Sequence, residues 1–167
     1  MEPVAELRRV VEGDIREAFR GVRLGRGMSL RQARLADGFP KSNLESVKHK
    51  TIEVVDDWSR VSLDELDQDC IAHLNAEGFR YYIPALMISA LDHYNSGSMR
   101  VIGTLSGLYP KKDSWDYHMY RYSLLDTTQK RAIARFLSAL PQLVKLNHVD
   151  ETIVPRALRN YWSQYLG

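Results

Sequence analysis

The sequence predicts a mainly α-helical protein, folded as a compact single-domain bundle of about six to eight helices over residues 1–167. Apolar residues recur every three or four positions through most of the chain, which is the spacing of one helix face. Several of these stretches open with Ser or Asp followed three residues later by Gln or Glu, which is the pattern of a helix-capping box. A chain of 167 residues with 44% hydrophobic and 26% charged residues has a globular composition and can bury one core.

The first helix is predicted over residues 4–22, where six apolar residues follow at steps of three and four. Gly13 lies in its middle and could divide it, because Gly costs about 1 kcal/mol relative to Ala inside a helix. The glycines of residues 21–27 end this stretch. Ser29 and Gln32 then fit a capping box, so a short helix is expected over residues 30–36.

The middle of the chain is predicted as short helices leading to one long buried helix. Residues 37–40 form a turn, 44–58 carry a broken apolar stripe after Ser42, and Ser62 opens a short helix over 63–71. The run Asn75-Ala76-Glu77-Gly78 is typical of a helix end, since Gly accepts the left-handed conformation there. We therefore expect 79–82 to be extended and the central buried helix to begin at Pro84 and cover 83–94.

The C-terminal part contains the least readable segment of the chain. Residues 101–108 favour a helix, with a short strand as the alternative, and an irregular region is expected within 99–122. Asp126 and Gln129 predict a capped helix that runs to Pro141. The last helix is expected to begin near Val154, with Pro155 in its first turn.

Cysteine usage and the N-terminus point to a reducing compartment. Cys70 is the single cysteine, so no internal disulfide can form. The chain begins without the basic and apolar regions of a signal peptide, and no apolar run reaches the roughly 20 residues that span a bilayer. These observations predict a cytoplasmic protein with no membrane partner.

Charge is distributed unevenly along the chain, although the formal net charge is +2. Residues 1–50 carry a net charge of +4, residues 51–100 carry −6, and residues 101–167 carry +4. The segments could neutralise one another across the fold. The alternative is an acidic surface that meets a basic protein partner, formed by Asp56, Asp57, Asp64, Glu65, Asp67 and Asp69.

Arg80 is the strongest candidate for ligand binding. It stands beside Tyr81 and Tyr82, ahead of the helix expected at Pro84, where free backbone N–H groups would favour an anion. Trp58 could complete such a pocket. The structural alternative is that Arg80 forms an ion pair and the aromatic residues pack in the core, which is the commoner arrangement.

A second group of candidates is basic. Arg16, Arg20, Arg23 and Arg26 could form a patch for nucleic acid, and the first three share helical spacing. Acidic residues lie among them, so a solvated helix face is the favoured interpretation and nucleic-acid binding is not expected. The turn Gly25-Arg26-Gly27 lacks the complete phosphate-binding motifs.

No motif for catalysis, metal binding or a cofactor is recognisable. The five histidines are scattered without zinc-binding spacing, and no nucleophile motif is present. We therefore expect no metal site and no cofactor, and a role without catalysis is favoured over an enzymatic one, which stays open as the alternative.

Several stretches resemble one known family. They are Leu24-Gly25-Arg26-Gly27-Met28-Ser29-Leu30-Arg31-Gln32-Ala33, Asp57-Trp58, and, most specifically, Gly78-Phe79-Arg80-Tyr81-Tyr82-Ile83-Pro84-Ala85. In this order they are similar to a family of short bacterial proteins classified as domain of unknown function 6714. The segment 41–55 departs from the family pattern. The resemblance implies a bacterial, cytoplasmic setting and supplies no activity, cofactor or catalytic residue.

Three functional hypotheses follow from the sequence. The leading one is a protein-binding module, of the neutralising or immunity type, that presents the acidic surface to a basic partner. The alternative is a small enzyme or ligand-binding domain with an anion pocket around Arg80. Nucleic-acid binding through the N-terminal arginines is the weakest of the three.

Overall fold

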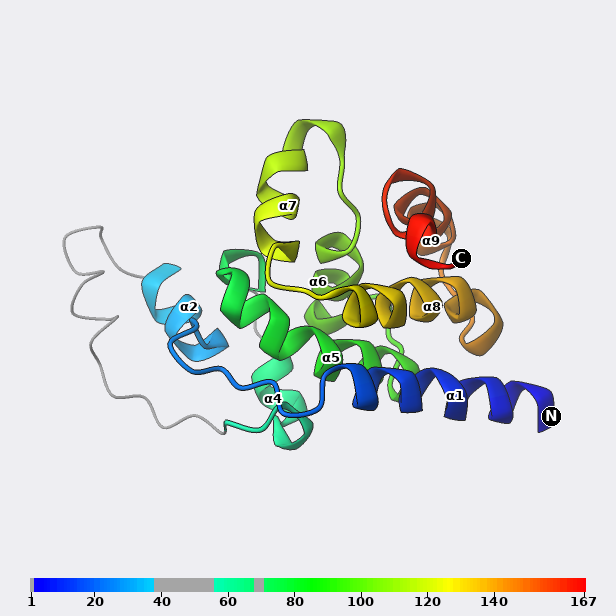
Figure 1. The fold of residues 1–167 in the computed structure, drawn as a ribbon, viewed down its shortest axis with the longest axis horizontal. Helices are drawn as coiled ribbons and strands as arrows, with labels where there is room; N and C mark the ends of the chain where they lie inside the picture. The colour runs from blue at the N-terminus through cyan, green and yellow to red at the C-terminus, as the bar shows by residue number, and fades with distance from the viewer. Residues whose placement is uncertain (1, 38–55, 68–70) are drawn as a thin grey trace.

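Helices make up the fold (Figure 1), and one continuous cluster of buried apolar side chains lies between them. The structure, a computed structural model, describes residues 2–37, 56–67 and 71–167. Within these ranges there are eight α-helices and no strand. The α-helices are α1 (Glu2–Ala18), α2 (Leu30–Asp37), α4 (Leu63–Leu66), α5 (Ala76–Asp92), α6 (Met99–Gly107), α7 (Trp115–Tyr122), α8 (Thr127–Leu143) and α9 (His148–Asn160). Short 3₁₀ turns join them: η2 (Trp58–Arg60), η3 (Ile71–His73), η4 (Lys112–Ser114) and η5 (Trp162–Tyr165).

The predicted mainly α fold is confirmed, and the segment that was hardest to read is more helical than expected. Residues 101–108 are helical, as favoured, and belong to α6. The strand or irregular region expected within 99–122 is instead α6, a short connection, and α7. The apolar face of α6 packs on α5 and η3, and this packing decides between helix and strand where local propensity does not.

Helix starts were predicted well where a capping box is present. Ser29 Oγ accepts from Gln32 N at 3.0 Å, and Gln32 Oε1 accepts from Ser29 N at 2.9 Å. The same reciprocal bonds join Asp126 and Gln129 at the start of α8. Ser62 caps α4, although that helix is a single turn. Helix α1 continues through Gly13 without a break.

Two helix starts were predicted wrongly, both at prolines. Helix α5 begins at Ala76, so Asn75 to Gly78 is a helix entry and not an exit, and residues 79–82 are helical. Pro84 lies in the helix interior. Pro155 likewise lies inside α9, whose cap is Asn147. In each case an Asn cap bonds a backbone N–H in the first turn, and this start wins over the position that proline alone would favour.

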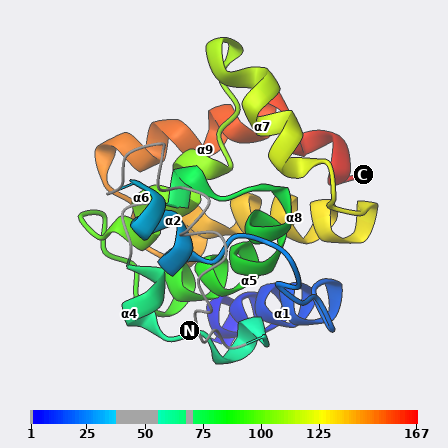
Figure 2. The same ribbon diagram turned by 90° about the vertical axis from the view of Figure 1, so that its left-hand side faces the viewer.

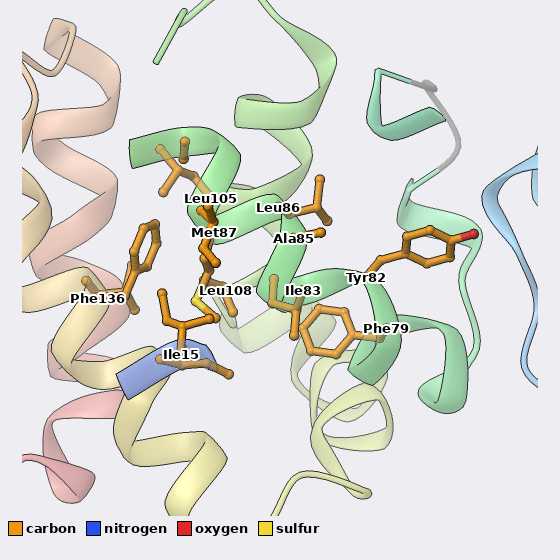
Figure 3. Close-up of a cluster of buried hydrophobic side chains, with 14 of the residues drawn as sticks. Ile15, Phe79, Tyr82, Ile83, Ala85, Leu86, Met87, Leu105, Leu108 and Phe136 are labelled. Carbon is orange, nitrogen blue, oxygen red and sulfur yellow. The ribbon is translucent and has the colours of Figure 1, made fainter. Parts of the chain in front are cut away.

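Helix α5 is the centre of the fold. Fourteen of its seventeen residues are buried, so it is apolar on every side. Figure 2 shows α5 near the middle, with α1 and α4 on one side and α7 and α9 on the other. In Figure 3, Met87 of α5 points toward Ile15 of α1 and Phe136 of α8, whereas Tyr82 points to the opposite side of α5. Helix α5 therefore contributes core side chains on two opposite sides.

Gly78 marks a close approach of two chain segments. A Cβ added at Gly78 would lie 2.4 Å from the backbone oxygen of Met28. A backbone atom cannot move aside as the end of a flexible side chain can. Asn75 Oδ1 accepts from both Gly78 N at 2.9 Å and Met28 N at 3.0 Å. Glycine is thus required at position 78 for steric reasons, not to end a helix.

We predict that Gly78→Ala lowers the free energy of unfolding by about 1–3 kcal/mol, the usual cost of overpacking. The matched control is Gly13→Ala, at an exposed position of α1 with no atom within 4 Å of the new Cβ. This control should stabilise the protein by up to about 1 kcal/mol. Urea unfolding measures both. Equal stabilities for Gly78→Ala and wild type would contradict the close approach.

Candidate functional site

The tyrosines of the Arg80 group lie in the core. Tyr81 and Tyr82 are fully buried, and their rings meet edge to face at 4.8 Å between centroids. Tyr82 Oη accepts from Leu30 N at 3.2 Å and donates to Glu65 Oε1 at 3.0 Å. Burial raises the pKa of both tyrosines above the ordinary value. These two side chains hold α5 to its neighbours and offer nothing to a ligand.

Arg80 itself is half-buried, and its Nε has no hydrogen-bond partner among the described residues. Neither Arg80 nor its two tyrosine neighbours lines the surface cavities beside Trp58 and Arg121. Trp58 is buried and donates from Nε1 to Phe19 O at 2.8 Å. The four residues predicted to form one pocket are therefore divided between the core and a different surface.

That surface brings together residues from two other predictions. A cavity of about 410 Å³ is lined by Arg16, Arg20, Gly21, Val22, Arg23, Asp56, Asp57, Trp58 and Ser59. Arg26 is not among its lining residues. Arg20 pairs with Glu17 at 2.5 Å, and Arg23 approaches Asp56 at 4.0 Å. The arginines predicted as a nucleic-acid patch thus share their surface with carboxylates that offset their charge.

Several predicted acidic residues take part in contacts within the protein. Asp56 accepts from Leu24 N at 2.7 Å, and Asp57 caps η2 by accepting from Ser59 N at 3.1 Å. The two hydrogen bonds from Ser59 also lower the pKa of Asp57.

The remaining acidic candidates that the structure describes also have partners within the protein. Glu65 is buried against Tyr82, Asp67 pairs with Arg100 at 2.6 Å, and Asp64 also has an interaction partner. Asp69 lies outside the described residues. The acidic binding surface stays a prediction, and its carboxylates have structural tasks.

The most unusual polar group was not predicted from the sequence. Arg121, near the end of α7, is 2% exposed and is among the largest fully buried side chains. It has no carboxylate partner within the part of the chain that the structure describes. By comparison, the half-buried Arg100 pairs with Asp67.

Arg121 is held by neutral groups. Its Nη1 donates to Tyr117 Oη at 2.7 Å, and its Nη2 donates to Ile71 O at 2.9 Å. The guanidinium lies over the rings of Phe79 at 4.6 Å and Tyr117 at 5.2 Å, so two aromatic faces also stabilise its charge. Nε has no partner within the described residues. Burial lowers the pKa of the guanidinium, and the nearby Tyr117 and Tyr122 side chains partly offset this decrease.

Arg121 lines a cavity of about 390 Å³ between η3, α6, η4 and α7. We call this the Arg121 cavity, and its lining residues are Ile71, Ala72, Met99, Ile102, Gly103, Ser106, Gly107, Ser114, Tyr117, His118 and Arg121. Met99 and Ile102 are exposed apolar residues at its edge. The wall therefore combines one buried cation with apolar side chains and small residues.

The helical spacing of α7 puts the polar side chains of the cavity wall on one face of that helix. Tyr117 and Arg121 are four residues apart on α7 and so lie on one face, one turn from each other. Gly103 of α6 allows η3 to pack closely, because a Cβ there would meet Ile71 Cδ1 at 2.6 Å. The Tyr117 hydroxyl also donates to Ala72 O, which fixes η3 against α7.

His118 is a buried, neutral member of this wall. Burial lowers its pKa, the Arg121 charge lowers it further, and a hydrogen bond to the Gly107 backbone opposes both effects. Its ring lies 5.9 Å from that of Tyr122 between centroids. Near neutral pH the side chain therefore adds no charge to the cavity.

Sequence reasoning missed this site for an identifiable reason. The arginine stands in Trp115-Asp116-Tyr117-His118-Met119-Tyr120-Arg121-Tyr122, where aromatic residues alternate with charges and the helical face is obscure. The available signal was the four-residue step from Tyr117 to Arg121, which requires the segment to be recognised as a helix. Burial of Arg121 depends on η3 and α5, which are remote in sequence.

The described residues contain neither a candidate metal site nor a candidate membrane span. No group of three or more His, Cys, Asp or Glu side chains is placed to hold a metal ion there. No helix in the same residues has the length and apolar character needed to cross a membrane.

We predict that protonation of His118 lowers the free energy of unfolding as the pH falls below about 6.5. A folded-state pKa below the unfolded value of about 6.5 means that the unfolded chain takes up the proton first. This contribution is complete above pH ~6.5 and is lost as pH falls through the folded pKa. Urea unfolding at successive pH values should show a smaller acid loss in His118→Asn than in wild type. The surface variant His148→Asn controls for removing a histidine, and an identical pH profile for His118→Asn and wild type would contradict the assignment.

Comparison with known proteins gives a family and no activity. The family described as "Family of unknown function (DUF6714)" matches residues 7–166. This confirms the family predicted from the sequence motifs. The searches of curated proteins and of solved structures found no match.

Proposed function

The chain belongs to this family of unknown function, DUF6714, and we propose that it is a ligand-binding protein whose Arg121 cavity takes a small organic anion. One observation carries the proposal. A fully buried arginine without a carboxylate partner in the described residues forms part of the wall of a cavity.

Burial of an unpaired charge is expensive, because the group loses its hydration. The Arg121 guanidinium recovers part of this cost from two hydrogen bonds and two aromatic rings, none of which carries a full negative charge. An anion in the cavity would supply that charge through short, charge-assisted hydrogen bonds. The arrangement therefore favours an anionic ligand over a neutral one.

The dimensions and the wall suit a small organic molecule. Ligand pockets usually have volumes of about 300–1,000 Å³ and mostly apolar walls with few polar groups. The Arg121 cavity, of about 390 Å³, is in this range. Met99 and Ile102 expose apolar surface at its edge and would cover the apolar part of a ligand.

We predict that anilinonaphthalene sulfonate, an apolar organic anion, binds the native protein with increased fluorescence. Ile102→Glu places a negative charge at the cavity edge and should weaken this binding roughly tenfold or more, about 1.4 kcal/mol. The matched control is Val10→Glu on α1, since Val10 is 44% exposed and Ile102 is 45% exposed. Fluorescence titration measures the dissociation constant of each variant.

Arg121→Met tests the cation directly and should abolish the binding. Because Arg121 also contacts Ile71 and Tyr117, circular dichroism must first show that this variant is folded. If it does not fold, the comparison of Ile102→Glu with Val10→Glu decides. No binding to wild type, or equal weakening by both surface substitutions, would contradict the proposed function.

A further inference from the structure

Resting on the proposed function, we infer that the Arg121 cavity selects a carboxylate with an apolar chain of medium length. It discriminates against a phosphate and against an uncharged molecule with the same chain.

The charge of the wall matches a single negative charge. Among the described residues that line the cavity, Arg121 is the one permanent cation, and no lysine and no carboxylate accompanies it. His118 is neutral near pH 7, since burial and Arg121 lower its pKa. A carboxylate carries one negative charge, whereas a phosphate monoester carries about −1.5 to −2 at pH 7. A phosphate would therefore leave negative charge unpaired in a partly apolar cavity, at a desolvation cost.

The donors of Arg121 suit the two oxygens of a carboxylate. A guanidinium has five N–H groups in a rigid plane. The bonds to Tyr117 and Ile71 use two of them, and Nε has no partner in the described residues. Three N–H groups therefore remain, and a carboxylate, which offers two acceptor oxygens, is a usual partner for a guanidinium group.

The rest of the wall suits an apolar chain of limited length. Four apolar residues line it: Ile71 and Ala72 of the η3 turn, and Met99 and Ile102 of α6, which are exposed. A volume of about 390 Å³ lies toward the lower end of the usual range of ligand pockets. This size suits a carboxylate with a chain of medium length.

The test compares three straight-chain compounds with eight carbon atoms each: octanoate, octanamide and octyl phosphate. Each competes with anilinonaphthalene sulfonate for the wild-type protein at neutral pH. We expect octanoate to displace the dye at concentrations roughly tenfold lower than either of the others. Equal displacement by octanamide, or equal or stronger displacement by octyl phosphate, would overturn the inference while leaving an anion-binding or ligand-binding cavity in place. If the dye fails to bind at all, the proposed function fails first.

A second variant tests whether charge sets the selectivity. Ile102→Lys adds a positive charge at an exposed edge position, so the fold should be retained. It should shift the preference from octanoate toward octyl phosphate several-fold, because the cavity would then carry two positive charges. Val10→Lys, on another helix, should leave the ratio of the two affinities unchanged. An unchanged ratio in Ile102→Lys would overturn the inference.

Discussion

The docking of the first turn of α5 against the segment before α2 is the constraint on which the rest of this structure depends. Asn75 Oδ1 binds the backbone N–H of Gly78 and that of Met28, so one oxygen caps the helix and joins two remote segments. The next residue in this turn, Phe79, places its ring beneath the Arg121 guanidinium. The position of α5 thus determines both the packing of the core and the surroundings of the buried cation.

The end of α6 is a second fixed point. Tyr122 Oη donates to Gly107 O at 2.6 Å, and Trp162 Nε1 donates to Leu108 O at 2.7 Å. The two rings also pack together, with centroids 4.8 Å apart. Helix α7 and the C-terminal turn η5 are therefore both fastened to the end of α6. This cluster holds together two walls of the Arg121 cavity, α6 and α7.

A buried arginine is a poor device for stability, because hydrophobic residues of similar volume usually stabilise a core as well or better. Here the guanidinium is surrounded by aromatic rings and neutral oxygens, while ion pairs such as Arg9–Glu6 and Arg20–Glu17 lie on the surface. Polar groups that are costly to the fold are concentrated at binding sites in many proteins. This contrast between Arg121 and the surface arginines marks the Arg121 cavity as a candidate binding site.

The sequence alone determined the helical class, the family and most helix starts. These depend on local physics: the spacing of apolar residues, and the bonds by which Ser29 and Asp126 satisfy N–H groups three residues ahead. Tertiary structure decided what local signals leave open. Pro84 stands inside a helix because the Asn75 cap and burial on every side outweigh one lost hydrogen bond. Arg121 is buried because Ile71 and Phe79 enclose it, and residues so remote in sequence meet it only in the folded chain.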